Sequence, residues 1–300
     1  MIQRYLGEIA ALLTAGCWTV SAMVFESAGK RVGSLSVNLI RLVIALLFLS
    51  LYTLPVRGMP LPLDAGPHEW FWLSLSGLVG FVMGDLFLFH AFVVIGSRIS
   101  MLIMALVPLF TALIGWMLMG EVLTSWNIMG MALTIGGIVL VVLERKQGQR
   151  MRLSHPVSGI LLALGGALGQ ATGLVLSKYG MAGYDPFAST QIRVIAGIGG
   201  FTVLFSIIRT WPRIFRALGD GRAMVNISLG AFFGPFLGVS FSLLAVQRTV
   251  AGVASTIMAI VPVLIIPPAM IIFRERVTLK EILGALVAVS GVALLFLFKY

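Results

Sequence analysis

A single carboxylate stands inside a long apolar segment of this sequence. Asp85 lies in GFVMGDLFLFHAF, with no other charged residue near it along the chain. Because a carboxylate in the middle of a membrane helix costs about 2.5–3.5 kcal/mol on insertion scales, another group should compensate it. Asp85 either faces a cavity, where it binds a substrate amine or carries a proton, or forms an ion pair or cap that fixes helix packing. His90, five residues later, is either a proton relay or a packed hydrogen-bond donor.

Two arginines occupy matching places, each about two turns into an apolar segment. Arg41 lies in NLIRLVIA and Arg193 in TQIRVIAG. Their guanidinium groups either meet an anionic substrate or Asp85, or extend toward lipid headgroups, as long basic side chains can. The matched positions favour a shared structural role, since substrate contacts need not repeat.

The composition predicts a membrane protein around these residues. The 300 residues are 59% hydrophobic and 11% charged, with a mean hydropathy of +1.05, far from the balance of a soluble domain. The net charge of +10 is expected to mark loops that face anionic lipid headgroups, so no nucleic-acid partner is expected. Cys17 is the single cysteine, and no Cys/His cluster has metal-ligand spacing. We therefore expect no disulfide within the chain, no metal and no other cofactor.

Ten apolar runs are long enough to cross a bilayer as helices. An outer-membrane barrel would show weakly alternating segments of about ten residues, and these are absent. The spans should therefore be helices, which satisfy their own backbone hydrogen bonds in lipid. The expected spans are 6–25, 35–56, 70–95, 99–119, 126–143, 157–177, 187–208, 224–246, 250–273 and 282–298.

The chain contains an internal repeat. At a shift of 152 residues Gly7 aligns with Gly159, and Arg41 aligns with Arg193. At a shift of 154 the aligned pairs are Gly80 and Gly234, Gly84 and Gly238, Pro108 and Pro262, Glu121 and Glu275, Gly130 and Gly284, and Gly137 and Gly291. We expect two five-helix units, residues 1–148 and 149–300. Five is odd, so the second unit must run inverted relative to the first, as is common in secondary transporters.

Basic residues divide unequally between the two sides that this arrangement defines. Five lie in links after even-numbered helices or at the termini, and fourteen lie in links after odd-numbered helices. By the positive-inside rule the fourteen-charge side is cytoplasmic, which places both termini outside. The fourteen are Lys30, Arg31, Arg98, Arg145, Lys146, Arg150, Arg152, Arg209, Arg213, Arg216, Arg222, Arg274, Arg276 and Lys280.

The alignment also pairs residues on the first and sixth helices. Trp18 aligns with Gln170, and we expect them on opposite walls of one cavity. Glu26 aligns with Lys178, of opposite charge. The latter two are either a gate, formed by an ion pair between the halves, or two solvated helix ends, and the second interpretation is favoured.

Matched glycines and prolines predict close packing and motion. Gly84 and Gly238, each with a second glycine one turn earlier, let helix backbones approach closely. Pro108 and Pro262 remove a backbone donor and kink their helices. Packing explains the glycines equally well, but the symmetric prolines favour hinges for alternating access.

Several of these features resemble one known family. Two five-helix halves, the MGE step at 119–121, and the glycine-rich stretches NIMGMALTIGGIVLVVL and EILGALVAVSGVALLFL resemble the EamA-type branch of the drug/metabolite transporter superfamily. The resemblance covers nearly the whole chain. It implies alternating access around a central cavity lined by both halves, and transport of amino acids, sugars or nucleotide derivatives. It also implies cytoplasmic termini, opposite to the charge count.

The leading hypothesis is therefore a secondary transporter, an exporter of a small polar or amphipathic metabolite such as an amino acid, in a bacterial inner membrane. Its expected partners are the substrate, protons and membrane lipid. An integral membrane enzyme acting on a lipid-linked substrate and a flippase-type subunit remain as alternatives. An enzyme would need paired carboxylates, a metal cluster or a nucleophile with its base. The eleven acidic residues are mostly scattered, so we expect no enzymatic activity.

Overall fold

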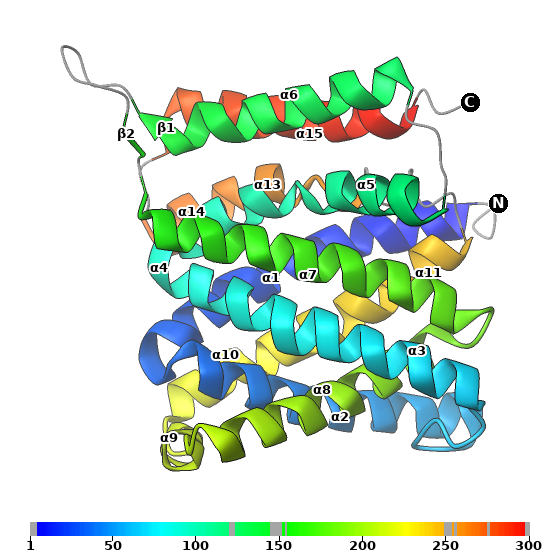
Figure 1. The fold of residues 1–300 in the computed structure, drawn as a ribbon. Coiled ribbons are helices and arrows are strands. Elements are labelled where there is room, and N and C mark those ends of the chain that lie inside the picture. Colours follow the sequence, from blue (N-terminus) through cyan, green and yellow to red (C-terminus); the bar gives the residue numbers. More distant parts are fainter. Residues whose placement is uncertain are drawn as a thin grey trace.

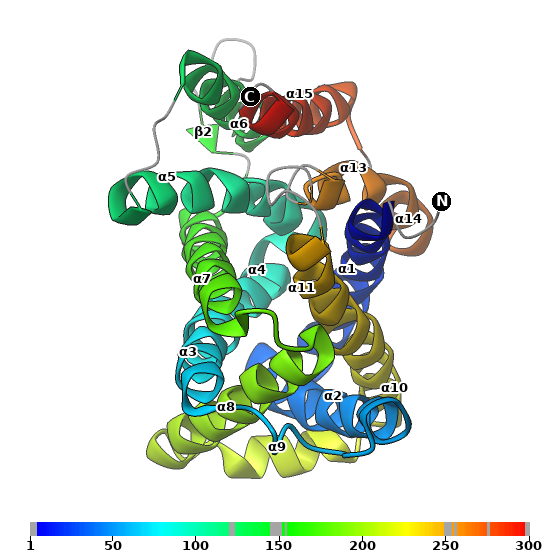
Figure 2. The ribbon, with the colours of Figure 1, turned by 90° about the vertical axis from the view of Figure 1, so that its right-hand side faces the viewer.

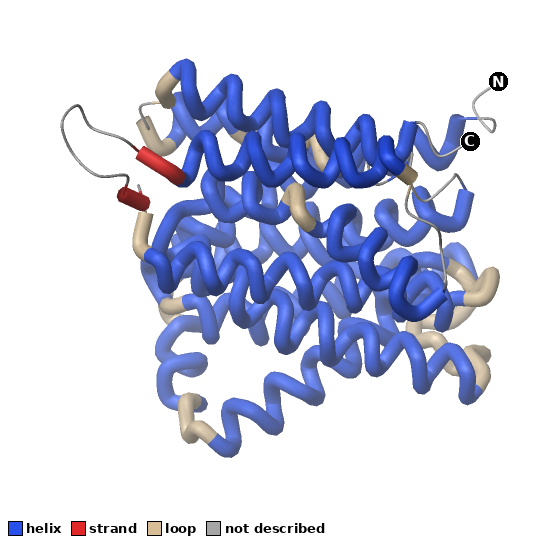
Figure 3. Tube along the Cα trace, turned by 45° about the horizontal axis from the view of Figure 1, so that its top comes forward, coloured by secondary structure: helices blue, strands red, loops and turns tan. Residues whose placement is uncertain are grey.

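The structure is a computed structural model that describes residues 5–119, 124–144, 152–153, 155–248, 254, 257–274 and 277–297. Nearly all of these residues are helical, as expected for an all-α protein, and the helices run between the same two ends of the molecule (Figures 1 and 3). The start of α1 (Leu6–Val32) and the finish of α15 (Leu279–Leu297) lie at one end, called here the termini end. The opposite end, which holds α9 (Trp211–Leu218), is called the α9 end.

Within the described residues, six helices are long and apolar enough to cross a membrane. They agree with six of the predicted spans. Four of the six are single helices, two from each half, and the other two, one from each half, are composites of several elements. The six are α1, α2 (Ser34–Arg57), the continuous run Pro67–Met104, α7 (Val157–Met181), α8 (Pro186–Ile207) and the continuous run Gly221–Arg248.

The other predicted spans coincide with helices that are shorter or near the minimum length. The count of ten transmembrane helices therefore stays a prediction. These helices are α5 (Val107–Met119), α6 (Ser125–Val142), α13 (Val261–Leu264), α14 (Ile266–Ile272) and α15.

Each composite run contains a wide π-helical section of seven residues. The first run consists of α3 (Pro67–Gly77), η2 (Leu78–Gly84) and α4 (Asp85–Met104). The second consists of α10 (Gly221–Ala231), η3 (Phe232–Gly238) and α11 (Val239–Arg248). η2 and η3 begin 154 residues apart, at the shift of the sequence repeat. Such wide turns inside helices often mark functional sites.

Two further breaks in the helices also lie 154 residues apart. The Leu106 N–H donates to the Ile103 carbonyl at 3.0 Å, and the Ile260 N–H donates to the Ile257 carbonyl at 3.2 Å. Both are tight i to i+3 turns, and both are followed by a helix with proline in its first turn, Pro108 in α5 and Pro262 in α13. Proline fits there because the first turn leaves its N–H groups without intrahelical partners. The two prolines therefore lie at matched breaks.

The first helix of each half packs on elements of the other half. α1 packs on α10, η3 and α11, and α7 packs on α3, η2 and α4. α2 packs against α8. Figure 2 shows this interlocked body, with α6 and α15 as a separate layer beside it.

Glycines bring α6 and α15 into close contact. A Cβ on Gly137 would lie 2.6 Å from the Gly284 carbonyl oxygen, and one on Gly291 would lie 2.7 Å from the Gly130 carbonyl oxygen. These are the glycines that the repeat aligns, and each helix contributes two of them. α6 runs toward the α9 end and α15 returns toward the termini end (Figure 1).

A short hairpin lies between α6 and α7. β1 (Leu143–Glu144) pairs antiparallel with β2 (Arg152–Leu153). The predicted boundary between residues 148 and 149 falls between these strands, outside the described residues. Glu121 and Glu275, which the repeat aligns, also lie outside the described residues.

Candidate substrate-binding cavity

Glycine packing places Asp85 beside α7. A Cβ on Gly169 would lie 2.6 Å from the Gly84 Cα, and one on Gly173 would lie 3.0 Å from the Gly80 Cα. The backbones of η2 and α7 therefore touch, which larger residues would prevent. As a result the Gln170 side chain reaches the wide turn, where its Nε2 donates to Asp85 Oδ1 and to the Gly80 carbonyl at 3.3 Å.

The second Asp85 oxygen belongs to an ion pair. Arg41 donates from its terminal nitrogen to Asp85 Oδ2, and both side chains are buried. Asn38, one turn before Arg41, accepts from Arg41 Nε at 3.4 Å and donates to the Asp85 backbone carbonyl at 3.3 Å. The structure thus gives Asp85 the ion-pair partner that one interpretation expected, and both carboxylate oxygens are occupied.

Aromatic rings surround the Arg41 guanidinium. Its central carbon lies 4.5 Å from the centre of the Phe89 ring, 5.6 Å from that of Phe81 and 5.7 Å from that of Phe25. Ring faces attract cations, and more strongly where water is excluded. The rings and the carboxylate together offset the desolvation of this cation.

Arg193 is equally buried, with 3% of its surface exposed, but it is differently surrounded. Its guanidinium carbon lies 4.8 Å from the centre of the Phe81 ring. Its Nε has no hydrogen-bond partner, and among the described residues its guanidinium donates no hydrogen bond to any other. Neither arginine extends to the exterior, so the headgroup interpretation is wrong for both.

These residues line a cavity of about 150 Å³ between the two halves. Its polar lining groups include Arg41, Asp85, Gln170 and Arg193. Most of the remaining wall is apolar. That part includes Phe25, Phe81, Leu88, Phe89, Phe92, Met101, Met104, Leu174, Val239, Met258 and Val261.

Further predicted residues also lie on the cavity wall. Trp18, on α1, and Gln170, on α7, both line it, as do Pro108 and Pro262. The cavity therefore brings together the carboxylate, the two arginines, the Trp18–Gln170 pair and the two prolines that the sequence singled out.

His90 does not join them. Five helical residues rotate the chain so that His90 lies roughly 140° around α4 from Asp85. Its ring is exposed, outside the cavity lining, and its Nδ1 lies 3.5 Å from Ser34 Oγ. The proposed proton relay between Asp85 and His90 has no support in this geometry.

Glu26 and Lys178 do not form an ion pair, and the favoured interpretation of two solvated helix ends holds for Lys178 but is wrong for Glu26, which is buried. Glu26 pairs instead with Lys30 and accepts the Ser97 backbone N–H at 2.6 Å. Ser97 begins a new helical segment after Gly96, which has a φ of +80°, so Glu26 caps that segment. Lys178 is exposed near the finish of α7. The pair cannot form because α1 finishes at the α9 end and α7 finishes at the termini end (Figure 1).

Gly84 and Gly238 have tightly packed surroundings. A Cβ on Gly84 would lie 3.3 Å from the Gly169 carbonyl carbon, whereas one on Gly238 would lie 2.8 Å from Trp18 Cδ1. Each glycine is therefore needed for close approach of α7 or α1, and their role as hinges stays a prediction.

Sequence reasoning missed the aromatic surroundings of the buried charges. Phe81 precedes Asp85 by four residues, and Phe89 and Phe92 follow it by four and seven, which places them on one face of the same helical run. That spacing was available in the sequence. The contribution of Phe25, from another helix, was not.

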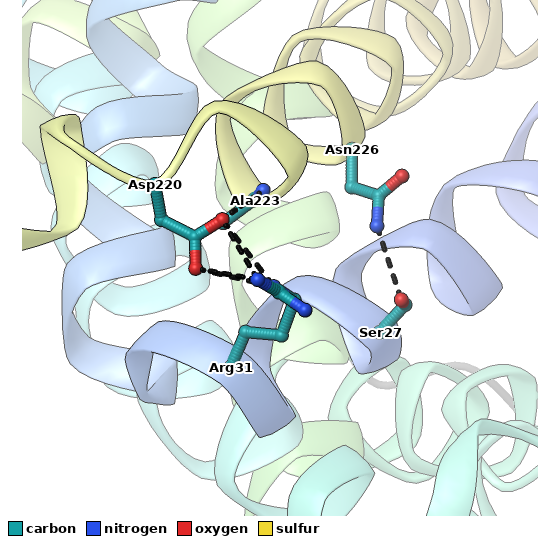
Figure 4. A network of polar contacts seen from close by, with 5 residues as sticks. All are labelled: Ser27, Arg31, Asp220, Ala223 and Asn226. Atoms are coloured by element: carbon teal, nitrogen blue, oxygen red, sulfur yellow. Dashed lines mark hydrogen bonds and ion pairs between the residues drawn. The ribbon is translucent and has the colours of Figure 1, made fainter.

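Polar contacts join the halves at the α9 end (Figure 4). Arg31, near the finish of α1, donates to Asp220 at 2.9 Å, and Asp220 accepts the Ala223 N–H at 3.0 Å. Asn226 donates to Ser27 Oγ at 3.0 Å. The Ala223 N–H and the Arg31 guanidinium lower the pKa of the Asp220 carboxyl.

A second polar cluster joins the halves at the termini end. Tyr184 donates to Asp64 at 2.7 Å, and Arg57 donates to Asp64 at 2.6 Å and to the Tyr184 hydroxyl at 3.2 Å. Partial burial and the bond to Asp64 raise the pKa of Tyr184 to about 12. The Tyr184 hydroxyl in turn lowers the pKa of Asp64. Each cluster thus ties the first helix of one half to the start of the third span of the other.

Comparisons with known proteins give one family. The model of the EamA-like transporter family matches residues 5–143 and, a second time, residues 157–297. A solved structure titled "Crystal structure of protein" is similar, with a TM-score of 0.68 and 18% sequence identity over 98% of this chain and 97% of that chain. At that identity the likeness concerns the fold alone. A search of curated proteins found no match.

Proposed function

Because the chain belongs to the EamA-like transporter family, we propose that it is a secondary transporter that exports a small amphipathic metabolite through the central cavity. Members of this family are transporters of the drug/metabolite transporter superfamily, not enzymes. The observation that carries the proposal is the cavity, which both halves line and which holds two guanidinium groups and one carboxylate. Membrane-length helices around it support a substrate path through the bilayer.

Inverted repeats are the proposed basis of the motion. The π-helical sections and the proline breaks recur at a shift of 154 residues, and aligned helices such as α6 and α15 run in opposite directions. In the α6–α15 contact, Gly137 meets Gly284 and Gly130 meets Gly291. This reciprocal use of the same positions is typical of a two-fold axis. An axis between antiparallel units lies in the membrane plane, an arrangement found in many alternating-access transporters.

The interlocked packing suggests which parts move together. Arg31 and Asp220 fasten α1 to α10, and Tyr184 and Asp64 fasten α7 to the start of the first composite run. We expect each fastened group to move as one body, since inter-half contacts fix it at one end. The breaks before Pro108 and Pro262 lie on the cavity wall between these bodies, where a change of helix direction would open one side and close the other.

The charge bias supports one orientation. The finish of α1, the hairpin and α9 lie at one end (Figure 1), and the links at this end carry most of the basic residues. The proposal places this end in the cytoplasm and both termini outside. A fluorescent reporter fused after Tyr300 should be inactive, whereas an alkaline phosphatase reporter at the same place should be active. Cytoplasmic fluorescence without phosphatase activity would instead support the opposite orientation that the family resemblance implies.

Transport can be tested with the full chain in liposomes. Proteoliposomes would be loaded in turn with radiolabelled amino acids, sugars, nucleotides and small monocarboxylates. Saturable efflux of at least one class is expected. For that class Asp85→Asn should reduce efflux to the level of protein-free liposomes, because both arginines then face the cavity without a counter-charge.

A matched carboxylate control separates transport from folding. Glu69→Gln, outside the cavity, should retain the efflux of the unmodified protein. Full efflux in Asp85→Asn would give Asp85 a packing role only. Chemical conversion of a lipid-linked compound without any efflux would favour the membrane-enzyme alternative.

A further inference from the structure

The cavity wall carries an uncompensated positive charge. Among the described lining residues, the ionised side chains are Arg41, Asp85 and Arg193. A guanidinium stays protonated in proteins, so two positive charges face one negative charge. A buried excess charge is costly unless another group pairs with it. The missing partner is therefore an anion.

Arg193 is the guanidinium that has no ion-pair partner among the described residues of the cavity wall. Asp85 is hydrogen-bonded to Arg41 through one oxygen and to Gln170 through the other, and no hydrogen bond joins it to Arg193. Arg41 also bonds to Asn38. Arg193 has an unpartnered Nε, although only 3% of its surface is exposed, and it lines the cavity. Its planar fork of donors suits a carboxylate, which can accept two parallel hydrogen bonds.

The rest of the wall limits the remainder of the ligand. Most of it is apolar, with four phenylalanine and three methionine side chains, and its two serine hydroxyls carry no charge to balance an ammonium group. The Asp85 carboxylate is already paired with Arg41. A dry cavity of about 150 Å³ accommodates one benzene-sized ring, and this cavity has a similar volume. The site therefore suits one carboxylate joined to one small apolar body.

From these observations we infer that the cavity binds a small aromatic or branched-chain monocarboxylate, whose carboxylate pairs with Arg193 and whose apolar body packs on the phenylalanine wall. That this ligand is a transported substrate rests on the proposed function. It makes a neutral, cationic or zwitterionic compound of the same size a poorer ligand. Binding of the anion brings the charge of the cavity to zero.

The test compares ligands of one size and different charge. The full chain in nanodiscs would be titrated by calorimetry with benzoate, benzylamine, benzyl alcohol and phenylalanine. Benzoate should bind and raise the melting temperature, since a ligand of the folded state stabilises it. Arg193→Gln should weaken benzoate binding about tenfold or more, because a hydrogen-bonded charge partner is lost.

Two further variants serve as controls. Arg213→Gln, an exposed arginine of α9, should leave benzoate binding unchanged. Arg193→Lys keeps the charge without the planar fork, so it should bind benzoate better than Arg193→Gln. Size-exclusion profiles would confirm that each variant is folded.

The possible outcomes separate this inference from the proposed function. Binding of phenylalanine or benzylamine in preference to benzoate would overturn the inference, as would the absence of binding by all four compounds or equal binding in Arg193→Gln. Efflux of another class from proteoliposomes would leave the transporter proposal intact in those cases. Tight benzoate binding without efflux of benzoate or any other compound would uphold the anion site and contradict transport.

Discussion

Arg41 and Arg193 occupy equivalent places in the two halves, but only Arg41 has a carboxylate beside it. The reason lies on the neighbouring helices. Asp85 directly follows η2 in the first half, and Val239 directly follows η3 in the second. Each half thus places a buried arginine near a wide helical turn. The difference between aspartate and valine after that turn gives Arg41 an ion-pair partner and leaves Arg193 without one in the described part of the chain. The repeat provides the architecture, and departures from it provide the chemistry.

The same contrast recurs at the ends of the molecule. Both polar clusters tie the first helix of one half to the start of the third span of the other. At the α9 end an arginine and a helix N–H meet Asp220, whereas at the termini end an arginine and a tyrosine hydroxyl meet Asp64. Equivalent places are again occupied by different donors. An acidic acceptor suits both places, since each lies before a helix start, where negative charge is favoured.

The largest expected effect tests whether the two arginines differ in their contribution to stability. Arg41→Gln removes the ion-pair partner of a buried carboxylate and should lower the free energy of unfolding by about 3–5 kcal/mol. Arg193→Gln removes a buried charge that has no hydrogen bond, so its destabilisation should be much smaller. Denaturation in mixed detergent micelles would measure both variants.

The exposed Arg213→Gln serves as a control for the loss of an arginine that has no place in the cavity. An equal loss of stability in Arg41→Gln and Arg193→Gln would show that the two halves are energetically alike. The contrast between a paired and an open arginine would then have no energetic basis.

The sequence repeat predicted the frame well. Glycines and prolines aligned at a shift of 154 residues mark the wide turns and the proline breaks, because these residues act locally on the backbone. Six predicted spans are confirmed by helices of membrane length. The fourth and ninth predicted spans contain the proline breaks, so apolar length alone did not predict the shape of their helices.

The contacts of the site could be predicted only in part. Asp85, Arg41, Gln170 and Trp18 were identified as cavity candidates because polar groups in apolar helices need partners. Their pairing depends on how helices far apart in sequence lie beside one another, and on how each is rotated. Periodicity within one helix carries no information on its neighbours. The ion-pair alternative for Glu26 and Lys178 fails for the same reason, since inverted halves place aligned residues at opposite ends.

A smaller effect is expected from restoring the missing carboxylate. Val239→Asp places an acid at the second-half position that aligns with Asp85, and Val239, like Arg193, lines the cavity. If the new carboxylate pairs with Arg193, the cavity no longer has an open guanidinium or an excess positive charge. Benzoate binding should then weaken about tenfold, while the protein remains folded because the new pair offsets its own burial.

Val239→Asn separates the charge from the change in shape, since asparagine matches aspartate in size but cannot form the ion pair. It should retain more benzoate binding than Val239→Asp, and Arg193→Gln combined with Val239→Asp should bind no worse than Arg193→Gln alone, because both changes act on one interaction. Equal weakening in Val239→Asp and Val239→Asn would mean that space, not charge, limits binding at this wall. Independent, additive losses in the double variant would mean that position 239 and Arg193 do not meet, and the difference between the halves would then lie elsewhere in the cavity.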